Sequence, residues 1–163
     1  MITKNNYSGN LSESDDKEFV VWDQKYVTGI EMIDDQHWQL VTLANELYRA
    51  CRDGEVQASA AFGVAMSRMV DYVRFHFGAE QQLLERIKYP NYSNHKKRHD
   101  TLVRNILDAA KEYKGGRKFV PHQFVRTLKD WVFGHIALTD KQYSLYVADQ
   151  KRKGLLTDQQ ING

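Results

Sequence analysis

The sequence predicts an all-α protein: an antiparallel up-down-up-down four-helix bundle with an irregular N-terminal arm and a short C-terminal helix. Two observations predict this fold. Four segments repeat apolar residues at the three- and four-residue spacing of a helix with one buried face. Breaks that contain glycine or proline separate these segments.

The chain is predicted to form one domain. Its 163 residues, 42% of them hydrophobic, suffice for one core and are too few for two. We expect residues 1–18 to be a flexible tail, residues 19–151 to be the helical domain, and residues 152–163 to be a second flexible tail. The arm at the start of the domain contains Trp22 and Tyr26 and should pack on the bundle.

The limits of the helices follow from residues that begin or stop helices. Gly54 stops the first helix, and Pro90 forbids continuation of the second. Ser93 or Asn94 can cap the third, and Pro121 suits the first turn of the fourth. The predicted helices are 34–52, 57–88, about 93–115 and 121–140, with a shorter helical piece continuing to about 151.

Composition excludes several classes of protein. The formal net charge of +2 is too close to balance for nucleic acid or an anionic membrane to be the main partner. The single cysteine, Cys51, cannot form an internal disulfide, which suits a reducing compartment. We find no signal-peptide pattern and no apolar run of the ~18 residues that a membrane helix needs. We therefore expect a cytoplasmic protein with no membrane insertion and no nucleic-acid partner.

Histidines and carboxylates stand among the apolar residues of all four predicted helices. A single histidine on an apolar face is more often a hydrogen-bonded core residue than a metal ligand. Imidazoles from four helices, together with a buried Glu80 that would cost several kcal/mol to leave unpaired, favour a shared cation instead. The candidate ligands are His37, His76, Glu80, His95, His99, His135 and Asp140.

Spacing tells which of these residues can act together. His76 and Glu80 are four residues apart, about 40° around a helix, so both can reach one ion. The pair His95 and His99 has the same spacing. Asp140 follows His135 by five residues, about 140° around a regular helix. Asp140 can join the site only if the fourth helix ends, widens or bends near residues 137–139.

The donor types favour two iron ions. Seven ligands are too many for one tetrahedral zinc, and none of them is a cysteine. The segment between His95 and His99 lacks the glutamate that a zinc protease needs as its base. Mixed imidazole and carboxylate ligation suits iron. The paired Glu-x-x-His motifs of di-iron oxygenases are absent.

Four motifs carry a resemblance to a known family. They are Ile33-Asp34-Asp35-Gln36-His37, His76-Phe77-x-x-Glu80, Tyr89-Pro90 followed by His95-x-x-x-His99, and Trp131-x-x-x-His135-Ile136-x-x-x-Asp140. Together they resemble the hemerythrin family in its bacterial single-domain form, over about residues 20–145. Gln81 stands where the family often has a second acidic residue, which is not a metal ligand.

The resemblance implies a non-haem di-iron centre. In this interpretation His95, His99 and His135 bind one iron, and His37 and His76 bind the other. Glu80, Asp140 and an oxo or hydroxo group bridge the two irons, and O2 binds at the open position of the second. Large apolar residues beside the ligands should keep this position dry. Those expected to line the O2 pocket are Leu40, Phe77, Leu102, Trp131 and Ile136.

The implied function is reversible O2 binding without turnover, for oxygen storage, buffering or transport. One alternative is an oxygen- or redox-sensing module that uses the same centre and a signalling partner. Sensor forms are usually fused to signalling domains, for which this chain has no room. A weaker alternative is a di-iron enzyme acting on peroxide or nitric oxide. Besides O2, the expected partners include an unidentified protein recipient or signalling protein.

Overall fold

The computed structural model describes residues 18–52, 55–115 and 121–162. The predicted tail lies outside this range except for Glu18. The long helices are α1 (Glu31–Arg52), α2 (Glu55–Arg86), α3 (Tyr92–Lys114) and α4 (Pro121–Gly134). α4 continues through a π-helical segment, η2 (His135–Asp140), into α5 (Lys141–Arg152), and α6 (Asp158–Asn162) ends the described chain.

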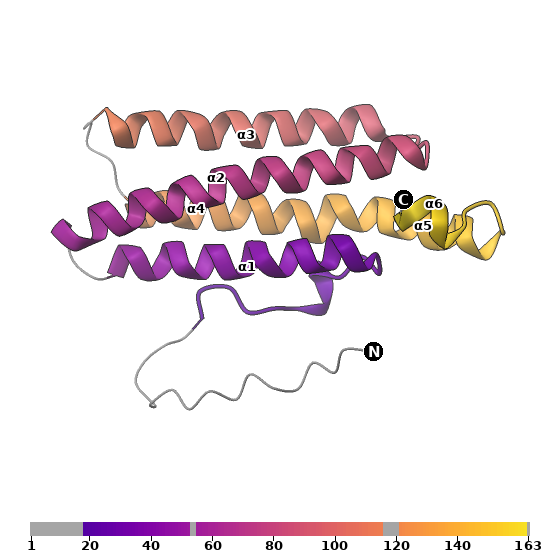
Figure 1. The fold of residues 1–163 in the computed structure, drawn as a ribbon, viewed down its shortest axis with the longest axis horizontal. Helices are drawn as coiled ribbons and strands as arrows, with labels where there is room; N and C mark the ends of the chain where they lie inside the picture. The colour runs from indigo at the N-terminus through magenta and orange to yellow at the C-terminus, as the bar shows by residue number, and fades with distance from the viewer. Residues whose placement is uncertain (1–17, 53–54, 116–120, 163) are drawn as a thin grey trace.

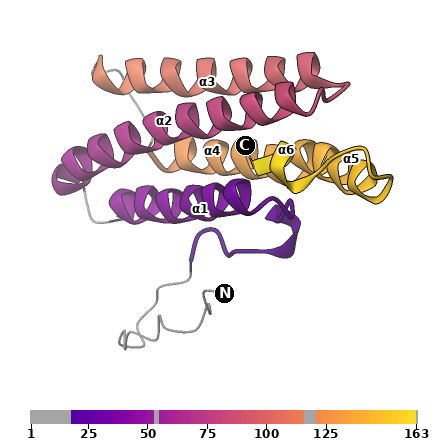
Figure 2. The ribbon, with the colours of Figure 1, turned by 45° about the vertical axis from the view of Figure 1, so that its right-hand side comes forward.

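The helices lie alongside one another as a bundle, which confirms the predicted all-α fold. In Figure 1 the N-terminal arm runs beside α1, and α5 and α6 lie together at one end. The view in Figure 2 shows the same arrangement. The described residues include no β-strand, and none of their helices combines the length and the hydropathy that a membrane span needs.

The N-terminal arm is tied to the bundle by hydrogen bonds. It contains a 3-10 turn, η1 (Gln24–Tyr26). The backbone N–H and C=O of Val20 both pair with the Asn45 side chain, at 2.8 and 2.9 Å. The Asp34 carboxylate accepts from the backbone N–H groups of Thr28 and Gly29. These bonds support the start of α1, which begins three residues earlier than predicted, and they confirm that the arm packs on the bundle.

The connection between α2 and α3 differs from the prediction at both ends. α2 ends two residues early, because Lys88 takes the left-handed backbone conformation, with φ 53°. α3 begins at Tyr92 with Asn91 as its N-cap, and the Asn91 side chain makes no capping hydrogen bond. The expectation that Ser93 or Asn94 caps α3 is therefore wrong, since both lie inside the helix.

The C-terminal segment is folded where a flexible tail was expected. Gly154, with φ 71°, ends α5 and lets the chain turn back. Arg86 on α2 donates hydrogen bonds to the backbone carbonyls of Gln160 and Ile161, at 2.8 and 2.7 Å. The Ile161 side chain is 4% exposed. The expectation of a fraying tail is wrong for α6, because a single apolar side chain and one arginine dock it.

Two apolar clusters make up the core, and they lie on either side of the polar residues along the helices. The larger contains Leu40, Val73, Phe77, Leu102, Ile136 and neighbours toward the α1–α2 connection. The smaller is made by Ile30, Ile33, Leu83, Leu84, Ile87, Tyr143, Val147 and Ile161. On α1, His37 falls between Ile33 and Leu40. The candidate ligands therefore interrupt an otherwise continuous core.

The helical spacing of apolar residues predicts that Trp131 and Leu138 lie on the inward face of the fourth helix, but both are exposed. Trp131 is 38% exposed and Leu138 is 71% exposed. Trp131 lies about 100° around the helix from the buried Val132, at the edge of the apolar face. Leu138 lies inside η2, where the wider turn changes the direction of each side chain. Counting at 3.6 residues per turn therefore gave the wrong direction for Leu138.

Candidate metal centre

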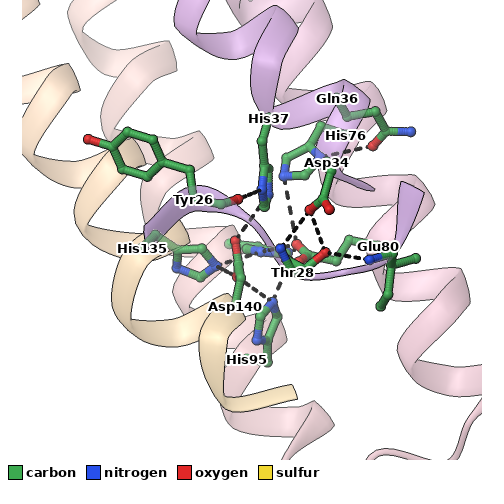
Figure 3. A network of polar contacts seen from close by, with 12 residues as sticks. Tyr26, Thr28, Asp34, Gln36, His37, His76, Glu80, His95, His135 and Asp140 are labelled. Atoms are coloured by element: carbon green, nitrogen blue, oxygen red, sulfur yellow. Dashed lines mark hydrogen bonds and ion pairs between the residues drawn. The ribbon is translucent and has the colours of Figure 1, made fainter. Parts of the chain in front are cut away.

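The seven predicted ligands converge in the middle of the bundle. α1 carries His37, α2 carries His76 and Glu80, and α3 carries His95 and His99, while His135 and Asp140 lie at the two ends of η2. Figure 3 shows six of these side chains directed toward one another. They form two groups with ligand atoms within 4.8 Å: Glu80, His95, His99, His135 and Asp140, and His37, His76, Glu80 and Asp140. Both carboxylates belong to both groups.

The π-helical segment brings Asp140 into the site. A π-helix closes hydrogen bonds between residues five apart, so residues at that spacing lie on nearly the same face. His135 and Asp140 are the first and last residues of η2, and Nε2 of His135 lies 3.0 Å from Oδ1 of Asp140. The predicted departure from a regular helix is confirmed, and it takes the form of a wider turn.

The distances between facing atoms suit a shared ion. Oε2 of Glu80 lies 3.0 Å from Nε2 of His99 and 3.4 Å from Nε2 of His95. Oδ2 of Asp140 lies 3.5 Å from Nε2 of His37. Metal bonds of about 2.0–2.2 Å, as in zinc sites, put ligand atoms at right angles about 3 Å apart. The donor atoms therefore already stand close to the separations that a common ion requires.

Most of the inward atoms lack a hydrogen bond. Among the described residues, both oxygens of each carboxylate and Nε2 of His37, His76 and His95 are buried without a hydrogen-bond partner. The short separations between imidazoles and carboxylates bring charges together without aligning donors and acceptors. Buried polar atoms are rarely left unpaired, so a cluster of them needs a ligand. A metal cation meets that need, and the donor set fits it.

Outer contacts orient the imidazoles. Nδ1 of His37 lies 2.8 Å from the backbone oxygen of Tyr26, and Nδ1 of His76 lies 2.9 Å from Oε1 of Gln36. The amide of Gln81 lies 3.3 Å from Nδ1 of His99, and its oxygen can accept the ring N–H when the amide is turned over. Such acceptors keep the proton on Nδ1 and leave the Nε2 lone pair facing inward.

Burial and the carboxylates set the pKa values of the imidazoles. Burial lowers the pKa of His76 to about 4, against the opposing effect of Glu80. Burial also lowers the pKa of His99, which Glu80 partly counteracts. For His37 and His135, burial acts in the same direction, but the adjacent Asp140 outweighs it and raises both pKa values. His76 is therefore neutral at neutral pH, which is the form that binds a metal.

Both carboxylates are ionised despite their burial. Burial would raise the pKa of Glu80, but His95 and His99 hold it well below the usual value. Burial and the charge of Glu80 would raise the pKa of Asp140, but His135 and His37 lower it. The site therefore holds two negative charges away from water, which a cation can neutralise.

Metal uptake is expected to weaken as the pH falls. The pKa values of His37 and His135 are raised above 6.5, so these imidazoles gain protons first as the pH drops, and their Nε2 atoms are then blocked. The carboxylates stay ionised, since their pKa values are lowered. Anaerobic Fe(II) titration of the metal-free protein at a series of pH values, with helical content followed in parallel, measures the effect. Equal Fe(II) affinity at pH values above and below 6.5 would contradict this expectation.

Apolar side chains surround most of the site. Phe77 stacks on the His99 ring, with centroids 3.7 Å apart. Leu40, Leu102 and Ile136, also predicted for the O2 pocket, are buried, at 0%, 6% and 2% exposure. Trp131 instead lines a surface groove of about 520 Å³ between α3 and α4. Whether these residues contact O2 stays a prediction.

The groove approaches one ligand from outside. His135 is among its lining residues, with Lys97 and Arg98 nearby. The His135 side chain is 8% exposed, whereas those of the other six candidate ligands are at most 1% exposed. The three-histidine group is therefore the part of the site nearest to solvent.

Sequence reasoning missed three contributors to the site. The Tyr26 carbonyl has no sequence signal, because any residue has one. Gln36 precedes His37 and points toward His76 on another helix, which spacing within α1 does not reveal. Tyr143 is fully buried, and the nearby Glu80 and Asp140 add to the effect of burial in raising its pKa well above the usual value. Its position three residues after Asp140 could have identified it. The spacing of the fourth helix predicts a surface position for His122, and its side chain lies outside the described residues.

Comparison with known proteins identifies the family. A family model described as the hemerythrin HHE cation binding domain matches residues 28–144. The bacteriohemerythrin of Methylococcus capsulatus is 29% identical over 119 residues, which cover 73% of this chain and 88% of the relative. That of Pseudomonas aeruginosa is 32% identical over 124 residues, 76% of this chain and 78% of the relative.

Solved structures agree with these sequence matches. A crystal structure of wild-type hemerythrin has a TM-score of 0.71 at 28% identity, and the match covers 77% of this chain and 95% of that one. A crystal structure of a hemerythrin mutant, in which one leucine is replaced by alanine, has a TM-score of 0.73 at 27% identity, covering 78% and 96%. The range matched by the family model contains all seven converging side chains. The chain belongs to the hemerythrin family.

Proposed function

We propose that this protein binds O2 reversibly at a non-haem di-iron centre and thereby stores, buffers or carries oxygen, without turnover. The observation that carries the proposal is the sharing of two carboxylates between a group of three imidazoles and a group of two. This arrangement suits two ions joined by carboxylate bridges, with fewer protein ligands on one ion than on the other. Membership of the hemerythrin family supports it.

Each side chain has a defined part in the proposed centre. His95, His99 and His135 would hold one iron, His37 and His76 would hold the other, and Glu80 and Asp140 would be shared between the two. Two bound ferrous ions would supply the two electrons that reversible O2 binding requires. Five neutral imidazoles and two carboxylates give the metal less negative charge than a carboxylate-rich site, which favours binding over oxidation of other molecules.

The surroundings support a binding role. Leu40 and Ile136 are buried near the ligands, and Phe77 covers one face of His99. An apolar surround limits the access of water and protons, which would otherwise release bound oxygen in reduced form and leave ferric iron behind. The experiment must therefore test reversibility, because an enzyme or a redox sensor could use the same ligands.

The oxygenation cycle tests the proposal directly. Iron-loaded protein is reduced anaerobically, exposed to O2 and then freed of O2 under argon, while its visible spectrum is recorded. We expect a coloured band that appears with O2 and disappears when O2 is removed, over several cycles. Rapid oxidation that argon does not reverse would overturn a carrier or storage role and favour a sensor or an enzyme.

Metal content gives a second, independent test. We expect two iron ions per chain after anaerobic reconstitution with Fe(II). A stoichiometry near one zinc per chain would contradict the di-iron assignment, because seven ligands exceed what one tetrahedral ion uses.

A further inference from the structure

A row of aromatic rings leads from the candidate metal centre to the protein surface. The ring of His95 contacts that of Tyr143, with centroids 5.6 Å apart. Tyr143 meets Tyr89 at 6.3 Å, and Tyr89 meets Tyr146 at 5.4 Å. Tyr143 is fully buried, whereas Tyr89 and Tyr146 are half-buried. We call Tyr143, Tyr89 and Tyr146 the tyrosine row.

The row is assembled from two parts of the chain. Tyr143 and Tyr146 lie on α5, three residues apart and so on neighbouring positions of one face. Tyr89 lies in the connection between α2 and α3, where Lys88 takes its left-handed conformation. Tyr143 belongs to the smaller apolar cluster, and Tyr89 and Tyr146 pack against it, beyond the candidate ligands. The row therefore occupies the end of the bundle that α5 and α6 cover.

Packing alone does not account for a phenol at position 143. The Tyr143 hydroxyl is buried near the Glu80 carboxylate and makes no hydrogen bond of normal geometry among the described residues. Burying a hydroxyl without a well-formed hydrogen bond is costly, and phenylalanine would fill the same space without that cost. A phenol differs from phenylalanine in one further respect, because it is readily oxidised by one electron.

We propose that the tyrosine row carries oxidising equivalents from the metal centre to the surface, and so protects the buried ligands from oxidation. The proposal rests on the proposed di-iron function. The oxidant is hydrogen peroxide, the two-electron reduction product of O2, reacting at the loaded centre. Because electron transfer slows steeply with distance, three short steps between adjacent rings are faster than one long step to solvent.

The chemistry balances with one co-reactant. Two tyrosines each lose one electron and the phenolic proton, so that two phenols and one hydrogen peroxide give two phenoxyl radicals and two waters. A radical moves outward when the next tyrosine gives up its electron and proton and the previous one is restored. At Tyr146 a diffusible one-electron reductant such as ascorbate returns the electron and the proton.

A second set of rings offers a comparison. On the side of His37, Tyr26 contacts Trp22 at 5.9 Å, and Trp22 contacts the exposed Trp38 at 5.5 Å. This set meets the ligand through the Tyr26 backbone carbonyl, whereas the tyrosine row meets His95 ring to ring. We therefore expect oxidation to follow the tyrosine row.

The experiment treats the iron-loaded full chain with one equivalent of hydrogen peroxide and follows radicals by freeze-quench electron paramagnetic resonance. Peptide mass spectrometry then locates oxidised residues. The variants are Tyr143→Phe and Tyr146→Phe. The matched control is Tyr48→Phe, which alters a half-buried tyrosine on α1 roughly 16 Å along the helix from His37.

The expected results differ between the variants. The unaltered chain and Tyr48→Phe give a tyrosyl signal that ascorbate removes, with oxidation concentrated at Tyr146 and Tyr89. Tyr143→Phe loses most of this signal and gains oxidised ligand histidines. Tyr146→Phe keeps a radical that ascorbate removes more slowly. Both variants should fold, because Tyr143→Phe removes only a buried hydroxyl that lacks a well-formed hydrogen bond and Tyr146 is half-buried.

Iron content and the oxygenation cycle are measured first on every sample. A chain that binds no iron overturns both the proposed function and the tyrosine row. A chain that binds iron and O2 reversibly, but gives no tyrosyl signal or an unchanged signal in Tyr143→Phe, overturns the tyrosine row alone. Oxidation found at Trp38 instead of Tyr146 in the unaltered chain would also overturn the proposed role of the tyrosine row alone.

Discussion

Replacing Glu80 with alanine is expected to remove both metal ions together, so that the iron content falls from two per chain to nearly none. The carboxylate belongs to both groups of candidate ligands. Its Oε2 atom lies within 3.4 Å of Nε2 of both His95 and His99. Loss of a shared ligand weakens both positions at once. Metal analysis by mass spectrometry after anaerobic loading and desalting measures the change.

Gln82→Ala provides the matched control for this substitution. Gln82 lies on the same helix as Glu80, and its side chain is exposed. The control is expected to keep both ions. If Glu80→Ala retained one ion per chain, the carboxylate would not be shared between the two ions, and if it retained two, the assignment of Glu80 as a ligand would be wrong.

Replacing His99 with alanine is expected to lose iron and also to destabilise the metal-free bundle. His99 has the shortest distance to the Glu80 carboxylate, 3.0 Å, and its ring stacks on Phe77. Without it, the buried Glu80 carboxylate loses a polar neighbour and a stacked ring is replaced by a cavity. We expect a loss of about 3 kcal/mol in the free energy of unfolding, within the range for truncating a large buried side chain to alanine.

Urea denaturation in the presence of a chelator measures this loss without contribution from the metal, and iron analysis is run in parallel. Arg104→Ala is the control, because Arg104 lies on the same helix and is exposed. It should change neither quantity appreciably. Unchanged iron content together with unchanged stability in His99→Ala would contradict both the ligand assignment and the expected cost of the cavity.

Much of the fold could be predicted because helix formation leaves a local signal. Apolar residues at helical spacing identified the four long helices, and Pro121 marked the start of α4 correctly. The same spacing put six of the seven candidate ligands on inward faces, and the structure brings all seven together. Asp140 required a departure from regular helix, and the π-helical segment supplies it.

The errors lie where neighbours decide the outcome. Ile161 is buried because Gly154 turns the chain back toward α2 and Arg86 holds the carbonyls there. No sequence pattern within residues 152–163 predicts that contact. Leu138 was directed inward by counting at 3.6 residues per turn, but the wider turn of η2 directs it to solvent. A local count fails when the helix itself changes its period.

The sequence by itself determined the helices, the direction of most polar side chains around each helix axis, and the likeness to the hemerythrin family. Only the tertiary structure decided that Glu80 and Asp140 are shared between two groups, that Gln36 orients His76, and that the Tyr143 ring contacts that of His95. The physical reason is that helical periodicity sets an angle within one helix. Distances between atoms on different helices depend on how those helices pack.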